Sequence, residues 1–291
     1  MFLVMTEAGI GMLMNTESTA LASAGNSGGL MPRFAANIAY MFTERASLLE
    51  RVGAAAQAGF KAIELQFPYD VPPATLRAEI EKHGLTVLGL NTERGGEGEF
   101  GLAAVPGRET EFKELFATAL DYIVDVGGRS VHCLAGRIAP ELRAAAHKTF
   151  VSNLRHAADL AAKRNIFLLI EPINNIERPN YFLNYVEQAA EIISAVGRDN
   201  VKIQFDFYHV QIMQGHLIRR FEKHQPLVGH IQIAAVPSRN EPDEGEIHHP
   251  EIFKALDRLG WTDWIACEYR PRARTEDGLG WARPYGVVPK A

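Results

Sequence analysis

The sequence has few cysteines, no long apolar run and no cluster of positive charge. Its 291 residues include two cysteines, Cys133 and Cys267. That is too few for the disulfide framework of a small secreted protein, so we expect reduced thiols and a cytoplasmic location. No stretch approaches the roughly 18–20 consecutive apolar residues of a membrane-spanning helix. Residues 1–30 contain no Lys or Arg, so they lack the positive segment that begins a signal peptide.

Positive charge is also scarce. The 30 Lys and Arg against 35 Asp and Glu give a net charge of −5, and no basic run is longer than a pair. Because proteins bind phosphate backbones through clustered Lys and Arg, we expect neither a nucleic acid nor a membrane surface as a partner. With 47% hydrophobic and 22% charged residues, the composition is that of an ordinary globular chain.

The beginning of the chain differs in composition from the rest. Ser, Thr, Ala, Gly and Asn dominate residues 15–29. We therefore predict a flexible N-terminal extension over residues 1–30 and a single domain over residues 31–291. One domain of this length is reasonable, because barrels often use roughly 250 residues as one unit.

From residue 31 onward, short apolar segments alternate with segments of helical periodicity. The apolar segments are predicted strands at residues 34–37, 62–65, 86–90, 130–134, 167–171, 201–206, 229–233 and 264–268. Alternation of strand and helix predicts parallel strands with right-handed crossovers, and eight such units predict an α/β fold, an eight-stranded (β/α)8 TIM barrel. The alternative is an open doubly wound sheet, but the glycine-rich loop that would favour it does not follow the first strand. Two long loops, residues 91–108 and 234–249, would lie at the catalytic face of the barrel as candidate lids.

Polar side chains end four successive predicted strands. Glu171, Asp206 and Glu268 end three of them, and Gln232 lies near the end of the fourth. Three carboxylates that converge on one barrel mouth would repel one another, and a divalent cation removes that repulsion. Three carboxylates and one amide oxygen form a hard oxygen site, which suits Mg²⁺ or Mn²⁺. Alternatively, Gln232 is an amide of the core. His230, which lies on the same side of the strand, would then be the metal ligand.

Several short motifs contain these residues. They are IEPIN at 170–174, QFDFYH at 204–209, GHIQIA at 229–234 and CEYRP at 267–271. Together they resemble the hydroxypyruvate isomerase family of the xylose-isomerase-like barrels, over residues 31–285. In this resemblance Glu171, Asp206, Gln232 and Glu268 match the metal positions. Related ketose 3-epimerases usually have histidine where Gln232 stands, so the sequence is closer to the isomerase branch.

The resemblance implies an aldose–ketose isomerase of carbohydrate metabolism, an intramolecular oxidoreductase acting on a small hydroxy-keto acid. Its prime case is hydroxypyruvate to tartronate semialdehyde through an enediolate; 2-oxo-tetronate isomerisation and ketose 3-epimerisation are alternatives. Glu171 and Glu268 come from opposite sides of the four-strand arc, so we predict that they transfer the proton as acid and base. The resemblance also implies a homodimer or homotetramer.

Three further residues are predicted to bind substrate. Glu177 matches a substrate-hydroxyl contact in the related epimerases, with an exposed loop charge as the alternative. His209 follows Asp206 by three residues and would reach a substrate oxygen, unless it only begins a helix. Arg239 lies in the second long loop, where it would bind the carboxylate of a keto acid bidentately; a solvent-exposed arginine is its alternative. His132 and Asn37 end other strands, where they would either line the pocket or pack.

Two functions of other classes are alternatives to an isomerase. An endonuclease IV-like phosphodiesterase shares this type of barrel, but it uses several zinc-binding histidines and a basic surface. A non-catalytic binder of sugar acids would not need two candidate bases.

Overall fold

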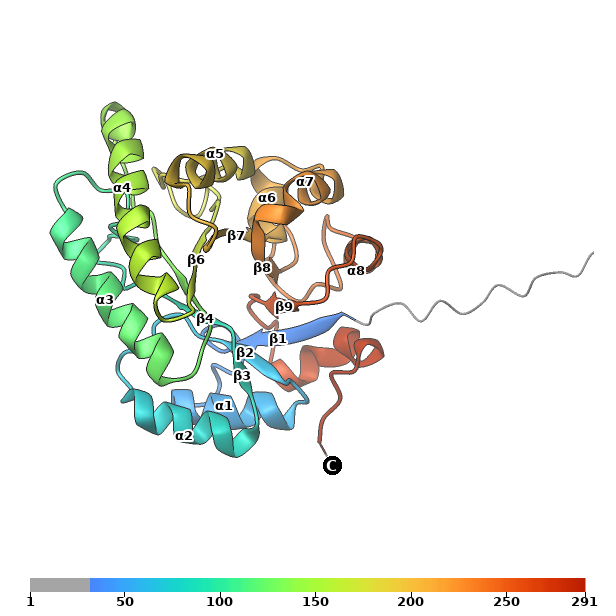
Figure 1. Ribbon diagram of the computed structural model, residues 1–291. Helices are drawn as coiled ribbons and strands as arrows, with labels where there is room; N and C mark the ends of the chain where they lie inside the picture. Colours follow the sequence, from blue (N-terminus) through green and yellow to red (C-terminus); the bar gives the residue numbers. More distant parts are fainter. Residues whose placement is uncertain (1–31, 291) are drawn as a thin grey trace, which may run out of the picture.

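The structure, a computed structural model, describes residues 32–290. The predicted extension over residues 1–30 lies outside the described residues. Parallel strands form a nearly closed barrel, and the helices pack around its outside (Figure 1). The TIM-barrel prediction is therefore confirmed.

The strands and helices alternate along the chain. The strands are β1 (Arg33–Asn37), β2 (Ala62–Glu64), β3 (Thr86–Val87), β4 (Gly89–Asn91), β5 (Ser130–His132), β6 (Phe167–Ile170), β7 (Val201–Asp206), β8 (Val228–Ile233) and β9 (Trp264–Cys267). The α-helices are α1 (Leu48–Gln57), α2 (Pro73–His83), α3 (Glu109–Asp125), α4 (Arg143–Ala162), α5 (Val186–Val196), α6 (Phe207–Met213), α7 (Leu217–His224) and α8 (His249–Arg258). Shorter 3-10 helices are η1 (Pro140–Leu142), η2 (Gln225–Leu227) and η3 (Thr275–Tyr285).

The described chain has nine strands rather than the predicted eight. The difference lies in the predicted strand 86–90, which divides at Leu88 into β3, paired with β2, and β4, paired with β5. Gly89 makes the approach to β5 possible, because a Cβ there would lie 2.4 Å from the Ser130 hydroxyl oxygen. The two short strands together occupy the third of the eight strand positions in the barrel.

Residues alternate along each strand between the barrel interior and the surrounding helices. Small and apolar side chains fill the interior at the end where the strands begin, in a cluster of Ala35, Ala62, Leu88, Trp264 and Ala266. Two residues further along the same strands, the interior side chains are polar: Asn37, Glu64 and Glu268. The barrel thus has an apolar base and a buried polar upper layer.

A capping box begins the first helix. Ser47 and Glu50 form the capping box of α1: the Glu50 N–H donates to the Ser47 hydroxyl at 3.2 Å, and the Ser47 N–H donates to the Glu50 carboxylate at 2.9 Å.

Both cysteines are buried and unbridged. Within residues 32–290, no helix combines the length and apolar character needed to cross a membrane.

Candidate active site

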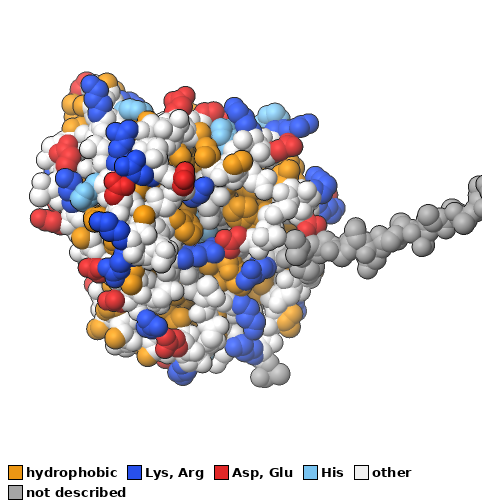
Figure 2. Space-filling model, viewed as in Figure 1, with side chains coloured by type: hydrophobic (Ala, Val, Ile, Leu, Met, Phe, Trp, Pro, Cys, Tyr) orange, Lys and Arg blue, Asp and Glu red, His pale blue; other side chains and the backbone are white. Residues whose placement is uncertain are grey.

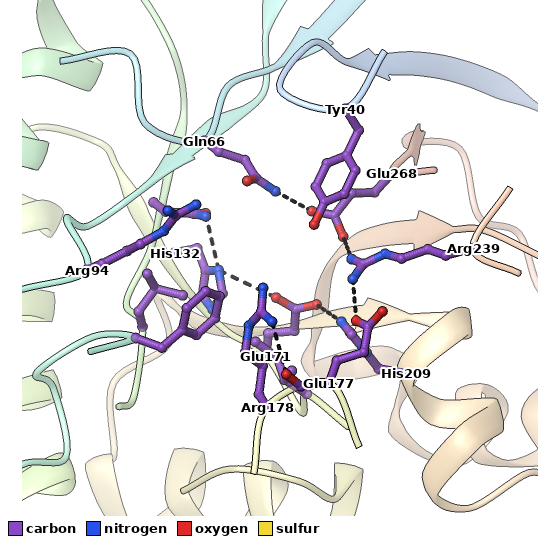
Figure 3. Close-up of a pocket in the computed structure, with 14 residues that line it drawn as sticks. Tyr40, Gln66, Arg94, His132, Glu171, Glu177, Arg178, His209, Arg239 and Glu268 are labelled. Carbon is purple, nitrogen blue, oxygen red and sulfur yellow. Dashed lines mark hydrogen bonds and ion pairs between the residues drawn. The ribbon is translucent and has the colours of Figure 1, made fainter. Parts of the chain in front are cut away.

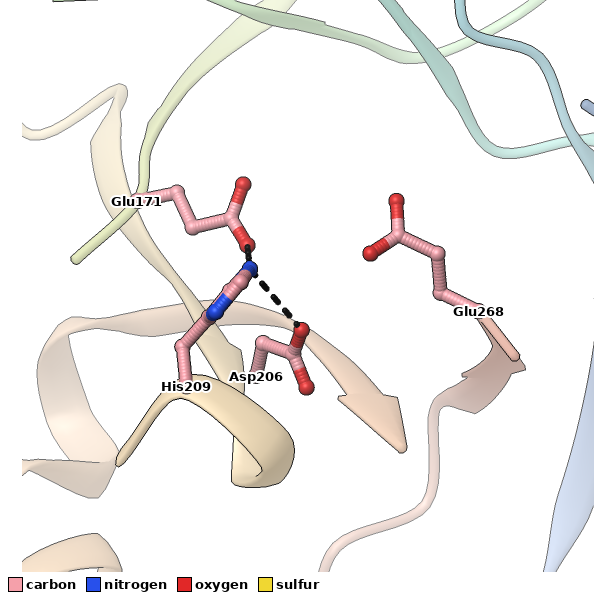
Figure 4. A group of neighbouring side chains, drawn as sticks. All are labelled: Glu171, Asp206, His209 and Glu268. Carbon is pink, nitrogen blue, oxygen red and sulfur yellow. Dashed lines mark ion pairs between the residues drawn. The ribbon is translucent and has the colours of Figure 1, made fainter. Parts of the chain in front are cut away.

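Four buried side chains meet at the ends of β6, β7 and β9. Glu171, Asp206, His209 and Glu268 each place one potential ligand atom within 4.8 Å of the others. Figure 4 shows the carboxylates of Glu171 and Glu268 pointing toward each other, with Asp206 and His209 near Glu171. The structure thus brings together the three carboxylates that the sequence predicted to converge.

Two of these carboxylates, Glu171 and Glu268, border a pocket at the strand ends. Glu171, Glu177, His209, Arg239 and Glu268 all line it (Figure 3). Every predicted catalytic and substrate-binding residue therefore lies at one pocket.

Several buried oxygens at this site have no hydrogen-bond donor among the described residues. They are Oε1 of Glu171, Oδ2 of Asp206 and Oε1 of Gln232. Leaving such oxygens unpaired in the interior costs free energy, and a bound cation would supply the missing partner. Asp206 and Gln232 are paired in register on neighbouring strands. The donor set thus fits a hard divalent ion.

The orientation of the Gln232 amide follows from Glu64, one layer deeper in the barrel. The Gln232 Nε2 group donates to both carboxylate oxygens of Glu64, at 2.9 Å each. The amide oxygen of Gln232 is therefore directed away from Glu64 and remains free as a ligand. His230, the alternative ligand, instead lies with its Nε2 3.0 Å from Glu64, so it belongs to the deeper layer.

His209 differs from the carboxylates in its chemistry. Its Nδ1 atom lies 3.4 Å from the backbone N–H of Asn174 and 2.7 Å from the Asn174 side-chain nitrogen. A backbone N–H can only donate, so Nδ1 accepts and the proton of the neutral ring is on Nε2. That Nε2 lies 3.6 Å from Glu171 Oε1 and 3.5 Å from Asp206 Oδ2. His209 thus presents an N–H group, rather than a free ring nitrogen, toward these two carboxylates.

Arg239 is buried and held by two carboxylates. Its Nη1 donates to Glu177 and its Nη2 to Glu268, both at 2.6 Å. The Tyr208 hydroxyl donates to the other oxygen of Glu177 at 3.0 Å. The backbone of Arg239 is left-handed, with φ 58°, and its carbonyl accepts from the Arg270 N–H at 2.7 Å. Both alternatives, an exposed Arg239 and an exposed Glu177 loop charge, are therefore wrong.

Burial changes the ionisation of the carboxylates. Burial and repulsion from Glu268 and Asp206 raise the pKa of Glu171 well above its ordinary value. Burial, with Glu268 as the next cause, raises the pKa of Asp206 to about 8. Burial also raises the pKa of Glu268, although Arg239 opposes it. Without a cation, the site thus retains protons at neutral pH.

The deeper carboxylate and the histidines behave differently. Burial acts to raise the pKa of Glu64, but His230 and hydrogen bonds from Gln232 lower it overall. Burial lowers the pKa of His209 well below its ordinary value, and it lowers the pKa of His132 to about 3. Both rings are therefore neutral at physiological pH.

Sequence reasoning missed several residues at this site. Glu64 binds Gln232, Gln66 donates to Glu268 at 2.5 Å, and Gln204 donates to Glu171 at 2.9 Å. Strand alternation could have found them, since Gln66 and Gln204 lie two residues from Glu64 and Asp206. Tyr40 and Arg178 come from loops and carried no periodic signal.

The chain is similar in sequence to a known family and to several known proteins. The sequence pattern of the family described as Xylose isomerase-like TIM barrel matches residues 52–285. The chain is 46% identical over 258 residues to the 2-oxo-tetronate isomerase of Cupriavidus necator, covering 88% of this chain and 99% of that protein. It is 39% identical over 258 residues to the hydroxypyruvate isomerase of Escherichia coli K12, covering 88% and 100%.

A solved structure is similar over the same region. A crystal structure described as AP endonuclease, family 2, from Brucella melitensis has a TM-score of 0.86 and 43% identity, covering 88% of this chain and 100% of that one. The resemblance to the hydroxypyruvate isomerases is confirmed by the relatives, and the chain belongs to the xylose isomerase-like TIM barrel family.

Proposed function

We propose that this protein is an aldose–ketose isomerase of small hydroxy-keto acids. Hydroxypyruvate to tartronate semialdehyde is the prime reaction, and 2-oxo-tetronate is a second substrate of the same chemistry. The observation that carries the proposal is the pair of buried carboxylates, Glu171 and Glu268, on opposite sides of one pocket. Relatives at 46% and 39% identity are named for these two reactions.

The proposed cofactor is one divalent ion, Mg²⁺ or Mn²⁺. Glu171, Asp206, Gln232 and Glu268 would hold it, because the first three have an unpaired buried oxygen and Glu268 places a carboxylate oxygen within 4.8 Å of those of Glu171 and Asp206. When bound, such an ion polarises the carbonyl of the substrate and stabilises the developing enediolate charge.

The proton transfer is assigned to the two carboxylates. One of them takes the proton from the hydroxyl-bearing carbon, and the other returns a proton to the neighbouring carbonyl carbon. The hydroxyl proton passes to the former carbonyl oxygen, so the product differs only in the position of the carbonyl. Gln66, Asn37 and Arg239 donate to Glu268 and fix its orientation.

The remaining pocket residues would orient the substrate. His209 directs its Nε2 N–H into the site and is a suitable donor to a substrate oxygen. Glu177 is held by Tyr208 and Arg239 at the edge of the pocket, where it would accept from a substrate hydroxyl.

The other function classes lack comparable support. An abasic-site phosphodiesterase would need a positive surface for the DNA backbone. The chain has a net charge of −5, and positive and negative side chains are interspersed over the face in Figure 2. A sugar-acid binder would have no use for two opposed carboxylates that can move a proton.

A substrate panel tests the proposal. Three- to six-carbon keto acids and ketoses are incubated with the metal-free protein and with added Mg²⁺ or Mn²⁺. We expect isomerisation of the small keto acids, restored by metal after chelation. Turnover of neutral ketohexoses alone would instead indicate a 3-epimerase, and cleavage of an abasic duplex would indicate a phosphodiesterase.

A further inference from the structure

The charges of the site leave a substrate carboxylate without a partner. Glu171, Asp206 and Glu268 with one divalent ion have a net charge of −1, and Arg239 and Glu177 form a neutral pair. A keto acid adds another negative charge, so the pocket needs positive charge elsewhere.

Arg239 does not fill this need as the sequence predicted. Both of its terminal nitrogens already donate to carboxylates at 2.6 Å, and the residue is 4% exposed. A substrate carboxylate at Arg239 would therefore have to share the guanidinium with Glu177 and Glu268, whose negative charges already surround it. Arg239 instead positions Glu177 and Glu268.

Two other arginines line the same pocket, Arg94 and Arg178. Among residues 32–290, neither forms an ion pair with a carboxylate, and the Arg178 side chain donates to the Glu177 carbonyl at 3.0 Å. Figure 3 shows Arg94 on the side of His132 and Arg178 beside Glu171 and Glu177. Their guanidinium groups are therefore available to an anion in the pocket.

Phe100 organises the two arginines. The Arg178 guanidinium carbon lies 4.5 Å from the centre of the Phe100 ring, and that of Arg94 lies 5.9 Å from it. Arg94 also stacks on Phe67 at 4.1 Å. Stacking on aromatic rings leaves the N–H edge of a guanidinium free to bind a carboxylate.

The backbone holds this arrangement in place. The Gly101 N–H donates to the Arg94 carbonyl at 2.7 Å, and Gly101 forms an antiparallel bridge with Ala135. The Phe100 ring packs edge-on against Tyr181 at 5.9 Å. Two loops from different strands are thus joined, so the backbones that carry the two arginines are held relative to each other.

We infer that Arg94 and Arg178, on either side of the pocket from loops 91–108 and 171–185, bind the carboxylate of the substrate. The inference rests on the proposed function and specifies its substrate class: small 2-keto acids, in preference to neutral ketoses. The two guanidinium groups supply the positive charge that the metal-ligand layer lacks.

The test compares Arg94→Gln, Arg178→Gln and the double variant with Arg219→Gln, a control whose side chain is 73% exposed on α7. We expect each single variant to raise KM for hydroxypyruvate about tenfold, as for loss of one charged hydrogen bond, with kcat changed less than about threefold. Turnover of a neutral ketose, where detectable, should not weaken. Arg178→Lys should recover part of the affinity.

Calorimetry with pyruvate separates this inference from the proposed function, because pyruvate has the carboxylate and ketone but no hydroxyl to isomerise. We expect its Kd to rise about tenfold or more in the double variant. An unchanged pyruvate Kd and KM in a folded double variant would overturn the subsite. A wild-type protein that binds pyruvate through these arginines but isomerises no keto acid would overturn the proposed function alone.

Discussion

Glu64 links the deeper layer of the barrel to the proposed metal ligands. It accepts from the Gln232 amide with both oxygens and from Asn37 at 2.9 Å, and it lies beside His230. Its effect on the metal is indirect, because it fixes which atom of Gln232 is free to bind. Such partners of metal ligands typically contribute about 10–100-fold to metal affinity.

We therefore predict that Glu64→Gln weakens Mn²⁺ binding by about 10–100-fold while the barrel remains folded. Calorimetric titration of the metal-free protein measures this directly. Glu81→Gln, whose side chain is 62% exposed on α2, is the matched control and should bind normally. A Glu64→Gln protein with wild-type affinity would show that Gln232 is oriented by something else or is no ligand.

At the residue scale, the sequence allowed prediction of the groups that end strands. Glu171, Asp206 and Glu268 each follow an apolar run, and parallel strands bring such ends together. The double pairing of Arg239 was not predictable, because a left-handed backbone in a long loop sets its direction and no periodicity encodes that. Glu64 was not predicted as a site residue, although its spacing from Gln66 follows strand alternation.

The loop over residues 91–108 is an element whose position depends on one glycine. Gly101 has φ +101°, and a Cβ there would lie 2.2 Å from the Leu134 carbonyl oxygen. Gly98, in the same loop, has φ +76°, but a Cβ there would meet nothing within 4 Å. A side chain at either glycine would strain the backbone. Only a side chain at Gly101 would also clash with the segment that follows β5.

We predict that Gly101→Ala lowers Tm by several degrees more than Gly98→Ala. Gly98→Ala should cost only the left-handed strain, about 1 kcal/mol, and the clash at Gly101 adds about 1–3 kcal/mol or displaces the loop. Thermal unfolding and KM for hydroxypyruvate measure the two consequences. Equal behaviour of the two variants would mean that the loop is not anchored at Gly101.

Element boundaries show the same limit of sequence patterns. The apolar run 86–90 predicted one continuous strand. The structure has strands at this position, but they are two short ones, β3 and β4. Its division at Leu88 follows from a change of partner, since Leu88 donates to Ile63 of β2 and Gly89 then pairs with Ser130 of β5. Such a change depends on closure of the whole barrel, which a local pattern does not contain.

At the scale of the whole molecule, the buried carboxylates connect stability to pH and metal. The folded pKa values of Glu171, Asp206 and Glu268 are raised, that of Asp206 to about 8. Above pH 7 the folded metal-free protein therefore binds more protons than the unfolded chain, and its stability falls as pH rises. The lowered pKa values of His132 and His209 make stability rise with pH instead, but only below the unfolded histidine pKa of about 6.5.

We predict that metal-free protein loses about 1.4 kcal/mol of stability per retained proton between pH 7 and 8. Saturating Mn²⁺ displaces these protons, so the gain in Tm that it gives should increase over the same range. Urea unfolding with and without metal measures both. A metal-free stability that is constant or rises from pH 7 to 8 would contradict the raised pKa values. Asp206→Asn should reduce the slope.

In the proposed reaction, Glu171 and Glu268 move a proton between adjacent carbons of a keto acid. The most direct measurement is deuterium incorporation from D₂O into the product during hydroxypyruvate isomerisation by the metal-loaded protein. We expect deuterium at the newly protonated carbon in the wild type, and rates lower by about 10²–10⁴-fold in folded Glu171→Gln and Glu268→Gln proteins. Isomerisation without deuterium uptake, or undiminished exchange in both variants, would contradict the account.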